Sequence, residues 1–145
     1  MPHAVRQSPL NCSNMENVEA SFSPMLYFEN VASAIEIYQN AFDAEELRRR
    51  TNEDGSVHVA EMKIGNAIFH LHEEVPRTKE LSPNTLGGTA VKLGLFVENP
   101  DEYRAKAMAA GAIPTSAVQN YDYGYRQGSL TDPFGHHWLV EKKIY

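Results

Sequence analysis

The chain has 145 residues, 42% hydrophobic and 22% charged, and 13 Lys and Arg against 19 Asp and Glu give a formal charge of −6. This is the composition of one globular domain with a real hydrophobic core, and it excludes a disordered or fibrous protein. The acidic balance argues against a nucleic-acid partner, no apolar run reaches the ~18 residues of a membrane span, and the single Cys12 excludes a disulfide framework.

The first 22 residues are polar and show no periodicity, so we expect residues 1–22 to form a flexible lead. They contain no apolar stretch of the kind that a secretory signal requires, which favours a cytoplasmic protein. Residues 23–145 are then expected to form a single domain.

The folded part begins with a strand-like run at residues 25–28, followed by Asn30 as a helix cap and by apolar residues at helical spacing up to Phe42. Turn signals then separate three predicted strands, at residues 45–51, 56–64 and 67–73. This gives a first module at residues 23–74.

Residues 75–89 contain prolines and a Gly-Gly pair, and are predicted to be a linker to a second module at residues 90–145. A strand at 91–97 leads to Asn99-Pro100, a cap followed by proline at the first helical position, and Gly111 fits the end of that helix. Three more strands are predicted, at residues 113–118, 126–131 and 137–143.

The two modules align with an offset of about 69 residues, which places residues 27–30 on 96–99 and residues 69–71 on 138–140. We therefore predict an α+β protein of two tandem βαβββ modules. A module of ~50 residues is too small to bury a sheet face alone, so it must pair with a second module.

The string Asp132-Pro133-Phe134-Gly135-His136-His137-Trp138 is similar to a DPFGHxW signature. With the duplicated plan, it resembles the vicinal oxygen chelate superfamily, which includes glyoxalase I, bleomycin- and fosfomycin-resistance proteins and extradiol dioxygenases. Two shorter segments, residues 60–65 and 123–126, are similar to motifs of one branch of that superfamily, the PhnB-like branch. The resemblance covers about residues 24–143. It implies an eight-stranded curved half-barrel sheet around a cavity, with the helices outside, commonly a homodimer and often a divalent metal.

Four positions resemble the metal-ligand slots of that superfamily: Ser23, His70, Lys92 and Leu139. Only His70 is a competent ligand, because serine is a poor one, a lysine ammonium repels a cation and leucine cannot ligate. We therefore expect neither the usual metal quartet nor a cofactor. The alternative is a divalent metal, Zn, Ni, Mn or Fe, held by His70, His72 and Glu61 on neighbouring strands.

Strand alternation and the resemblance together give a set of residues expected to line the cavity. The set is Tyr27, Glu61, His70, His72, Lys92, Phe96, Tyr123 and Arg126. Lys92 either pairs with an anionic ligand or forms a structural pair with a glutamate, and Arg126 either binds an anion or pairs with Asp132. We expect His136 to hydrogen-bond to backbone and His58 to pack beside the apolar face of its strand.

Three functions are compatible with these features. The first is a glyoxalase- or bleomycin-resistance-like protein that binds a small organic molecule without metal. The second is a divalent-metal-dependent lyase, isomerase or dioxygenase. The third is a regulatory or structural dimer with a vestigial cavity. We expect the protein to bind a small-molecule ligand and to form a homodimer. We do not expect it to bind nucleic acid or a membrane.

Overall fold

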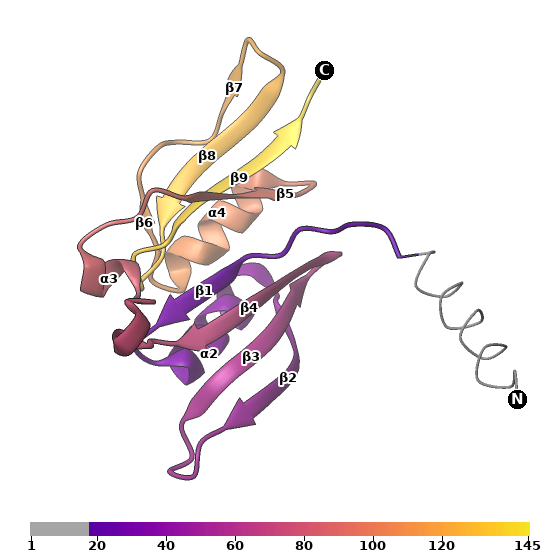
Figure 1. Ribbon diagram of the computed structural model, residues 1–145. Coiled ribbons are helices and arrows are strands. Elements are labelled where there is room, and N and C mark those ends of the chain that lie inside the picture. The colour runs from indigo at the N-terminus through magenta and orange to yellow at the C-terminus, as the bar shows by residue number, and fades with distance from the viewer. Residues whose placement is uncertain (1–17) are drawn as a thin grey trace, which may run out of the picture.

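The computed structural model describes residues 18–145 (Figure 1), so Cys12 and residues 1–17 of the predicted lead lie outside it. The elements of the first module are β1 (Met25–Phe28), α2 (Val31–Phe42), β2 (Glu45–Thr51), β3 (Val57–Ile64) and β4 (Ala67–Glu73). The elements of the second are β5 (Lys92–Phe96), α4 (Pro100–Ala109), β6 (Ile113–Pro114), β7 (Gln119–Tyr121), β8 (Tyr125–Thr131) and β9 (His137–Lys143).

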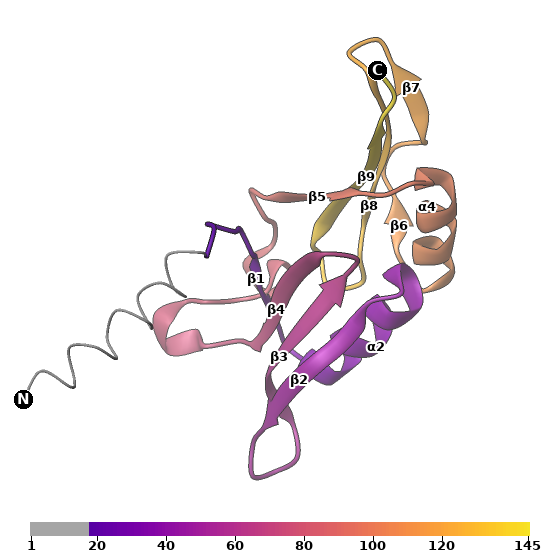
Figure 2. The ribbon, with the colours of Figure 1, turned by 90° about the vertical axis from the view of Figure 1, so that its right-hand side faces the viewer.

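Each module forms its own sheet. The first has the strand order β1-β4-β3-β2, with β1 parallel to β4 and the other neighbours antiparallel. The second repeats this order as β5-β9-β8-β6, with β7 also paired to β8. Helices α2 and α4 lie on the same side of both sheets (Figure 2). The α+β class and the tandem plan are confirmed, as curved sheets of four and five strands that do not close into a barrel over residues 18–145.

The second strand of the second module differs from the prediction, because the expected strand at 113–118 is divided into β6 (Ile113–Pro114) and β7 (Gln119–Tyr121). Pro114 pairs with Leu130 and Gln119 with Gln127, so four residues of this edge lie opposite two of β8. The extra residues form a bulge. Pro114 is uncommon inside a strand, but the local sequence does not show which residues of β8 this segment lies opposite.

Both long helices begin at the asparagine caps that the sequence predicts. The side-chain oxygen of Asn30 accepts from the N–H of Ser33 at 3.0 Å, and that of Asn99 accepts from the N–H of Glu102 at 3.2 Å. Each cap satisfies one of the N–H groups that a helix start leaves without a partner. Neither these helices nor any other in the described part of the chain has the length and apolarity needed to cross a membrane.

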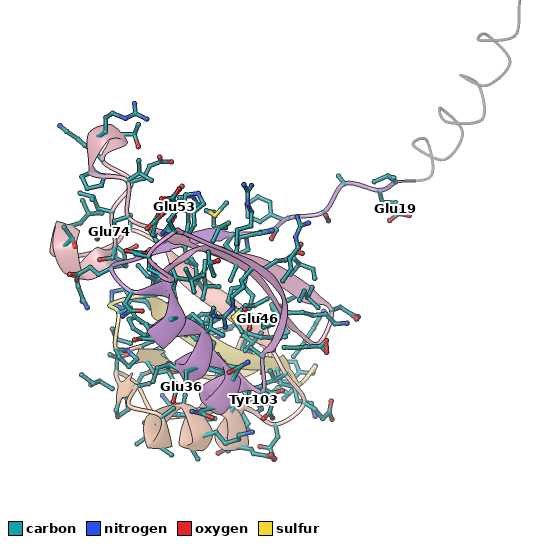
Figure 3. All side chains as sticks on the ribbon, turned by 90° about the horizontal axis from the view of Figure 1, so that it is seen from below. Glu19, Glu36, Glu46, Glu53, Glu74 and Tyr103 are labelled. Atoms are coloured by element: carbon teal, nitrogen blue, oxygen red, sulfur yellow. The ribbon has the colours of Figure 1, made fainter. Side chains whose placement is uncertain are left out.

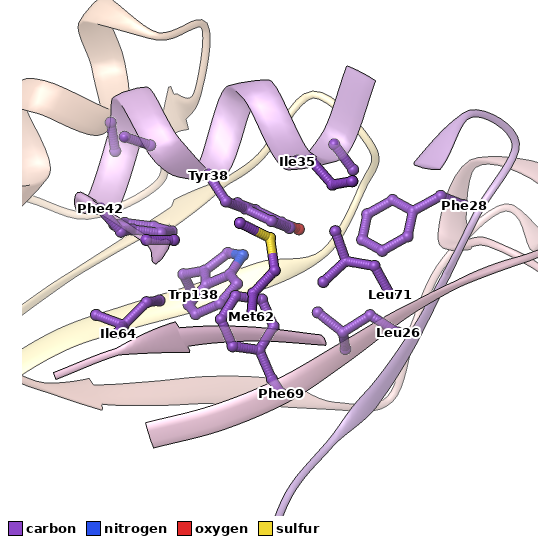
Figure 4. Packing of buried hydrophobic residues seen from close by; sticks show 14 of the residues in the cluster. Leu26, Phe28, Ile35, Tyr38, Phe42, Met62, Ile64, Phe69, Leu71 and Trp138 are labelled. Atoms are coloured by element: carbon purple, nitrogen blue, oxygen red, sulfur yellow. The ribbon is translucent and has the colours of Figure 1, made fainter. Parts of the chain in front are cut away.

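One hydrophobic core joins the two modules (Figure 4). Trp138 of β9 packs on α2, with its ring 4.7 Å from that of Phe42 and 5.5 Å from that of Tyr38. Phe28 of β1 and Phe69 of β4 complete an aromatic cluster around Tyr38. Because the second module covers the helix of the first, each supplies the apolar partner that the other lacks.

The carboxylate of Asp132 is buried in this core and accepts four hydrogen bonds. Its Oδ2 accepts from the Tyr38 hydroxyl at 2.5 Å and from Nε1 of Trp138 at 2.9 Å. Its Oδ1 accepts from the N–H groups of Phe134 at 2.9 Å and His136 at 3.0 Å, which fixes the turn between β8 and β9. Burial, reinforced by the charge of Asp132, raises the pKa of Tyr38 well above its ordinary value.

The segment between the modules is folded back on the first sheet and contains η1 (Pro76–Thr78) and α3 (Pro83–Leu86). Glu74, labelled in Figure 3, holds it by accepting from the N–H of Ser82 at 2.8 Å and from the hydroxyl of Thr85 at 2.5 Å. Burial opposes ionisation of Glu74, but these hydrogen bonds outweigh it and lower the pKa of its carboxyl. The predicted linker is thus an ordered connection.

We expect Asp132→Ala to lower the free energy of unfolding by about 3–5 kcal/mol, since it leaves the Tyr38 hydroxyl and the indole N–H of Trp138 without their acceptor. Urea denaturation measures this loss. Asp122→Ala removes an exposed aspartate in the turn after β7 and should change stability by no more than about 0.5 kcal/mol. Equal losses in the two variants would contradict the role given to Asp132.

Candidate functional site

Alternation along the strands determines which side chains reach the face of each sheet opposite the helices, here called the open face. On β4, Phe69 and Leu71 are buried towards the helices, which leaves His70 and His72 on the open face as predicted. On β9, Trp138 is buried towards the helices, which leaves His137 and Leu139 on the open face. The open faces therefore carry most of the polar residues that the sequence singles out.

His70 lies at the centre of a polar group on the first sheet. It is the cross-strand partner of Glu61, and its Nε2 is 3.4 Å from Oε2 of Glu61. Its Nδ1 is 3.5 Å from the hydroxyl of Ser23, which itself donates to the carbonyl of Ile68 at 2.6 Å. Nε of Arg48 is 3.4 Å from the other oxygen of Glu61. The group presents an imidazole and a carboxylate, and a hollow of about 170 Å³ opens beside it.

His72 belongs to a second group, at the far end of the same strand. Its ring lies 4.6 Å from that of His58, and its Nδ1 is 2.6 Å from the carbonyl oxygen of Glu73. His58, expected to pack beside an apolar face, instead hydrogen-bonds through Nδ1 to the carboxylate of Glu73. The structure thus brings together only two of the three residues of the alternative metal site.

The residues at the four positions that resemble metal slots do not fit a metal. Ser23 and His70 are adjacent, but Lys92 and Leu139 bring an ammonium and a hydrocarbon to the second sheet. Among residues 18–145 there is no group of three or more His, Cys, Asp or Glu arranged to hold a metal ion. The donor set, one imidazole with one carboxylate nearby, falls short of the three protein ligands that a catalytic metal usually has.

Arg126 does not reach the open face. It lies on the helix side of β8, where it donates to both carboxylate oxygens of Asp101 on α4 at 2.8 Å, and to Asn120 at 2.9 Å. The pair considered between Arg126 and Asp132 does not form, because the two residues lie at opposite ends of β8 and Arg126 pairs with Asp101 instead. Arg126 fastens α4 to the second sheet, and the bond it donates lowers the pKa of Asp101.

Tyr27 lies at the edge of the first sheet, beside the connecting segment. Its hydroxyl donates to Glu80 at 2.8 Å, and its carbonyl oxygen is 3.2 Å from Nε2 of His136. His136 therefore makes the backbone contact expected of it, and burial lowers its pKa in spite of the nearby charge of Asp132. Tyr27 lines a hollow of about 390 Å³ between β1 and the connecting segment.

A groove of about 350 Å³ runs between the first sheet and β5, and is called here the inter-sheet groove. Its lining residues are Phe22, Pro24, Ile64, Ala67, Ile68, Phe69, Val91, Lys92, Leu93, Gly94, Leu95 and Trp138. Lys92 is the one charged residue among them, is exposed, and has no ion pair within residues 18–145. The volume of the inter-sheet groove is in the range of small-molecule pockets.

The second sheet contributes a residue that the expected set omits. Glu141 of β9 is on the open face, only 8% exposed, and accepts a hydrogen bond from Nε2 of Gln127 at 2.9 Å. Burial raises the pKa of its carboxyl. Two residues of the expected set lie nearby, Phe96 on β5 and Tyr123 in the turn between β7 and β8, and they are 62% and 58% exposed. Alternation from Leu139 places Glu141 on this face, but its burial depends on neighbouring strands.

Comparison with known proteins identifies relatives over most of the chain. The model of the Glyoxalase/Bleomycin resistance protein/Dioxygenase superfamily matches residues 22–140. The uncharacterized protein Rv0887c of Mycobacterium tuberculosis is 40% identical over 131 residues, which are 88% of this chain and 77% of that protein. The uncharacterized protein Mb0911c of Mycobacterium bovis has the same identity and is covered over 86% of its length.

Solved structures share the fold at lower identity. TioX from Micromonospora sp. ML1 has a TM-score of 0.67 and 20% identity, over 87% of this chain and 98% of that one. The gene product AT5G48480 of Arabidopsis thaliana has a TM-score of 0.67 and 27% identity, over 85% and 98%. The fosfomycin resistance protein FosX of Listeria monocytogenes, complexed with Mn(II) and sulfate, has a TM-score of 0.63 and 17% identity, over 88% and 90%.

The bond between His58 and Glu73 predicts a pH-dependent stability. It lowers the pKa of the Glu73 carboxyl, although burial acts in the opposite direction. A lowered pKa stabilises the fold above the ordinary value of 4.5, and this contribution is lost as the pH falls through the lowered pKa. We expect Glu73→Gln to have a lower Tm than the parent at pH 7, with the gap closing below about pH 4. Thermal unfolding over this pH range, with Glu53→Gln as an exposed control, tests it; a constant gap would contradict it.

Proposed function

Because this chain belongs to the glyoxalase/bleomycin resistance protein/dioxygenase superfamily, we propose that it binds a small organic molecule in the inter-sheet groove, without the metal quartet found in other members. The observation that carries this proposal is the inter-sheet groove, an apolar hollow of about 350 Å³ with Lys92 at its rim. Narrower membership of the PhnB-like branch stays a prediction.

The chemistry of the groove suits an amphipathic molecule. Ile68, Val91 and Leu93 offer aliphatic surface, and removing a ligand's apolar surface from water contributes roughly 25 cal/mol per Å². The ammonium of Lys92 can meet a hydrogen-bond acceptor or anionic group at one end. A few polar groups around an apolar lining are the usual composition of a ligand site.

A second candidate function rests on the His70–Glu61 pair. The 3.4 Å between Nε2 of His70 and Oε2 of Glu61 would let both side chains hold one divalent metal, which would then act as a Lewis acid in a lyase, isomerase or dioxygenase reaction. His72 lies with His58 instead, so two ligands come from this chain. Binding without metal is therefore the preferred function.

A homodimer remains part of the proposal. Leu86, Val91 and Ile113 are large apolar residues that are 59–65% exposed, and a second copy of the chain would remove such surface from water.

We expect the protein, after treatment with EDTA, to bind members of a library of small amphipathic compounds, with NMR shifts concentrated at Ile68 and Leu93. Val91→Trp, which fills the groove from its rim, should weaken these compounds about 10-fold. Val18→Trp places the same ring at a position that is 75% exposed and does not line the groove, and should leave binding unchanged. The proposal fails if no compound binds, or if both variants bind as the parent does.

Metal analysis separates the two candidate functions. In protein purified without chelators, we expect Zn, Ni, Mn and Fe together to amount to well under one ion per chain, with no change in His70→Ala. His58→Ala is the control for loss of an imidazole outside the pair. Stoichiometric metal that disappears in His70→Ala and persists in His58→Ala would establish the metal-dependent function instead.

A further inference from the structure

We propose that the open face of the second sheet contains a subsite for an organic cation, a protonated amine or quaternary ammonium group, formed by the carboxylate of Glu141 and the rings of Phe96, Tyr123 and Tyr125. The subsite rests on the proposed function, since it would receive one end of the small molecule. It assigns that molecule to a chemical class.

Glu141 is a largely buried residue, and one of its carboxylate oxygens has no partner in the described part of the chain and is open to solvent. Its Oε1 accepts from Nε2 of Gln127, whereas no group within residues 18–145 donates to its Oε2. No Lys, Arg or His of the described chain lies within 4.0 Å of it. The residue as a whole is only 8% exposed, so its ionised carboxylate loses part of its hydration, and a cation at the open Oε2 restores the lost interaction.

Gly94 leaves the space in which this carboxylate lies. A Cβ atom at Gly94 would be 2.7 Å from Oε2 of Glu141, closer than real Cβ atoms approach an oxygen. Gly94 and Glu141 belong to neighbouring parallel strands, β5 and β9, and Gly94 also lines the inter-sheet groove. A ligand in the groove thus has a route over Gly94 to the carboxylate.

Aromatic rings form the rest of the subsite. Phe96 is the strand partner of Glu141, and its ring is 6.1 Å from that of Tyr125, two strands away. Tyr123 continues this row, with its ring 6.1 Å from that of Tyr125. The hydroxyl of Tyr123 donates to the side-chain oxygen of Gln127, which turns the amide N–H towards Glu141. The polar end of the tyrosine is occupied, and the ring remains for a ligand.

This combination favours an organic cation over other ligands. Aromatic faces attract cations through their quadrupole, most strongly where water is excluded. Inorganic divalent cations require several oxygen or nitrogen ligands, whereas the subsite offers one carboxylate, because the amide oxygen of Gln127 already accepts from Tyr123. An anion is repelled by Glu141. Lys92, two residues before Gly94 on the same face, repels a cation from the other end and so orients the ligand.

The test compares 2-naphthylmethylamine, charged at pH 7, with the neutral 2-naphthylmethanol by isothermal titration calorimetry. The parent protein should bind the amine about 10-fold more tightly. Glu141→Gln should abolish this preference while the affinity for the alcohol stays within about 2-fold. Glu98→Gln, which removes an exposed carboxylate paired with Lys142 on the helix side, should keep it.

A stability measurement shows that the variant folds and is a second test. Because burial raises the pKa of Glu141, its ionised form costs stability as the pH rises through that pKa, and the cost is absent below the ordinary value of 4.5. Glu141→Gln should therefore have a Tm at or above that of the parent at pH 7, with the advantage vanishing in acid. A lower Tm at pH 7 would mean that the carboxylate already has a partner, and would overturn the subsite.

Equal binding of amine and alcohol by the parent would overturn the cation subsite and leave small-molecule binding intact. Binding of neither compound would also overturn the subsite, and the library experiment on the groove would then decide the proposed function separately. A preference for the amine that survives in Glu141→Gln would assign the cation to another group.

Discussion

The carboxylate of Asp132 lies where the two modules meet and accepts hydrogen bonds from both sides of that junction. Tyr38 donates from the helix of the first module, and Trp138 and two backbone N–H groups donate from the second. A buried charge is tolerated only with such full pairing, so the arrangement permits one relative position of the modules. The inter-sheet groove exists because that position is fixed, and the four bonds give a structural reason for the aspartate of the DPFGHxW string.

Much of the fold could be predicted because it depends on local rules. The caps Asn30 and Asn99 mark helix starts through bonds to residues three positions away, and alternation along β4 and β9 assigns each side chain to a face. The break at residues 115–118 could not be predicted, since a bulge is set by the partner strand. Val118 packs so closely on Gly128 of β8 that a Cβ at position 128 would be 2.6 Å from its side chain, and only the folded sheet brings these two residues together.

The candidate site was less predictable, because it depends on distances between strands. Alternation places His70 and His72 on the same face, two residues apart on β4. His70 nevertheless pairs with Glu61, whereas His72 packs against His58. Glu141 has an unremarkable place in the sequence, and becomes significant through Gly94 on a strand more than 40 residues earlier. The sequence predicts Arg126 on the open face, but it lies on the helix side of β8, because the neighbouring Gln127 is the residue that reaches the open face.

The outer strands of the two sheets have a consequence for how this protein can associate. β2, at one outer edge, carries Arg48, Arg49 and Arg50, and the other outer edge is interrupted by the bulge between β6 and β7. Consecutive charges and irregular backbone both hinder the addition of a further strand. Growth into an extended sheet is thus blocked at the outside, so that contact with another chain is directed to the faces and to the inner edges that border the groove.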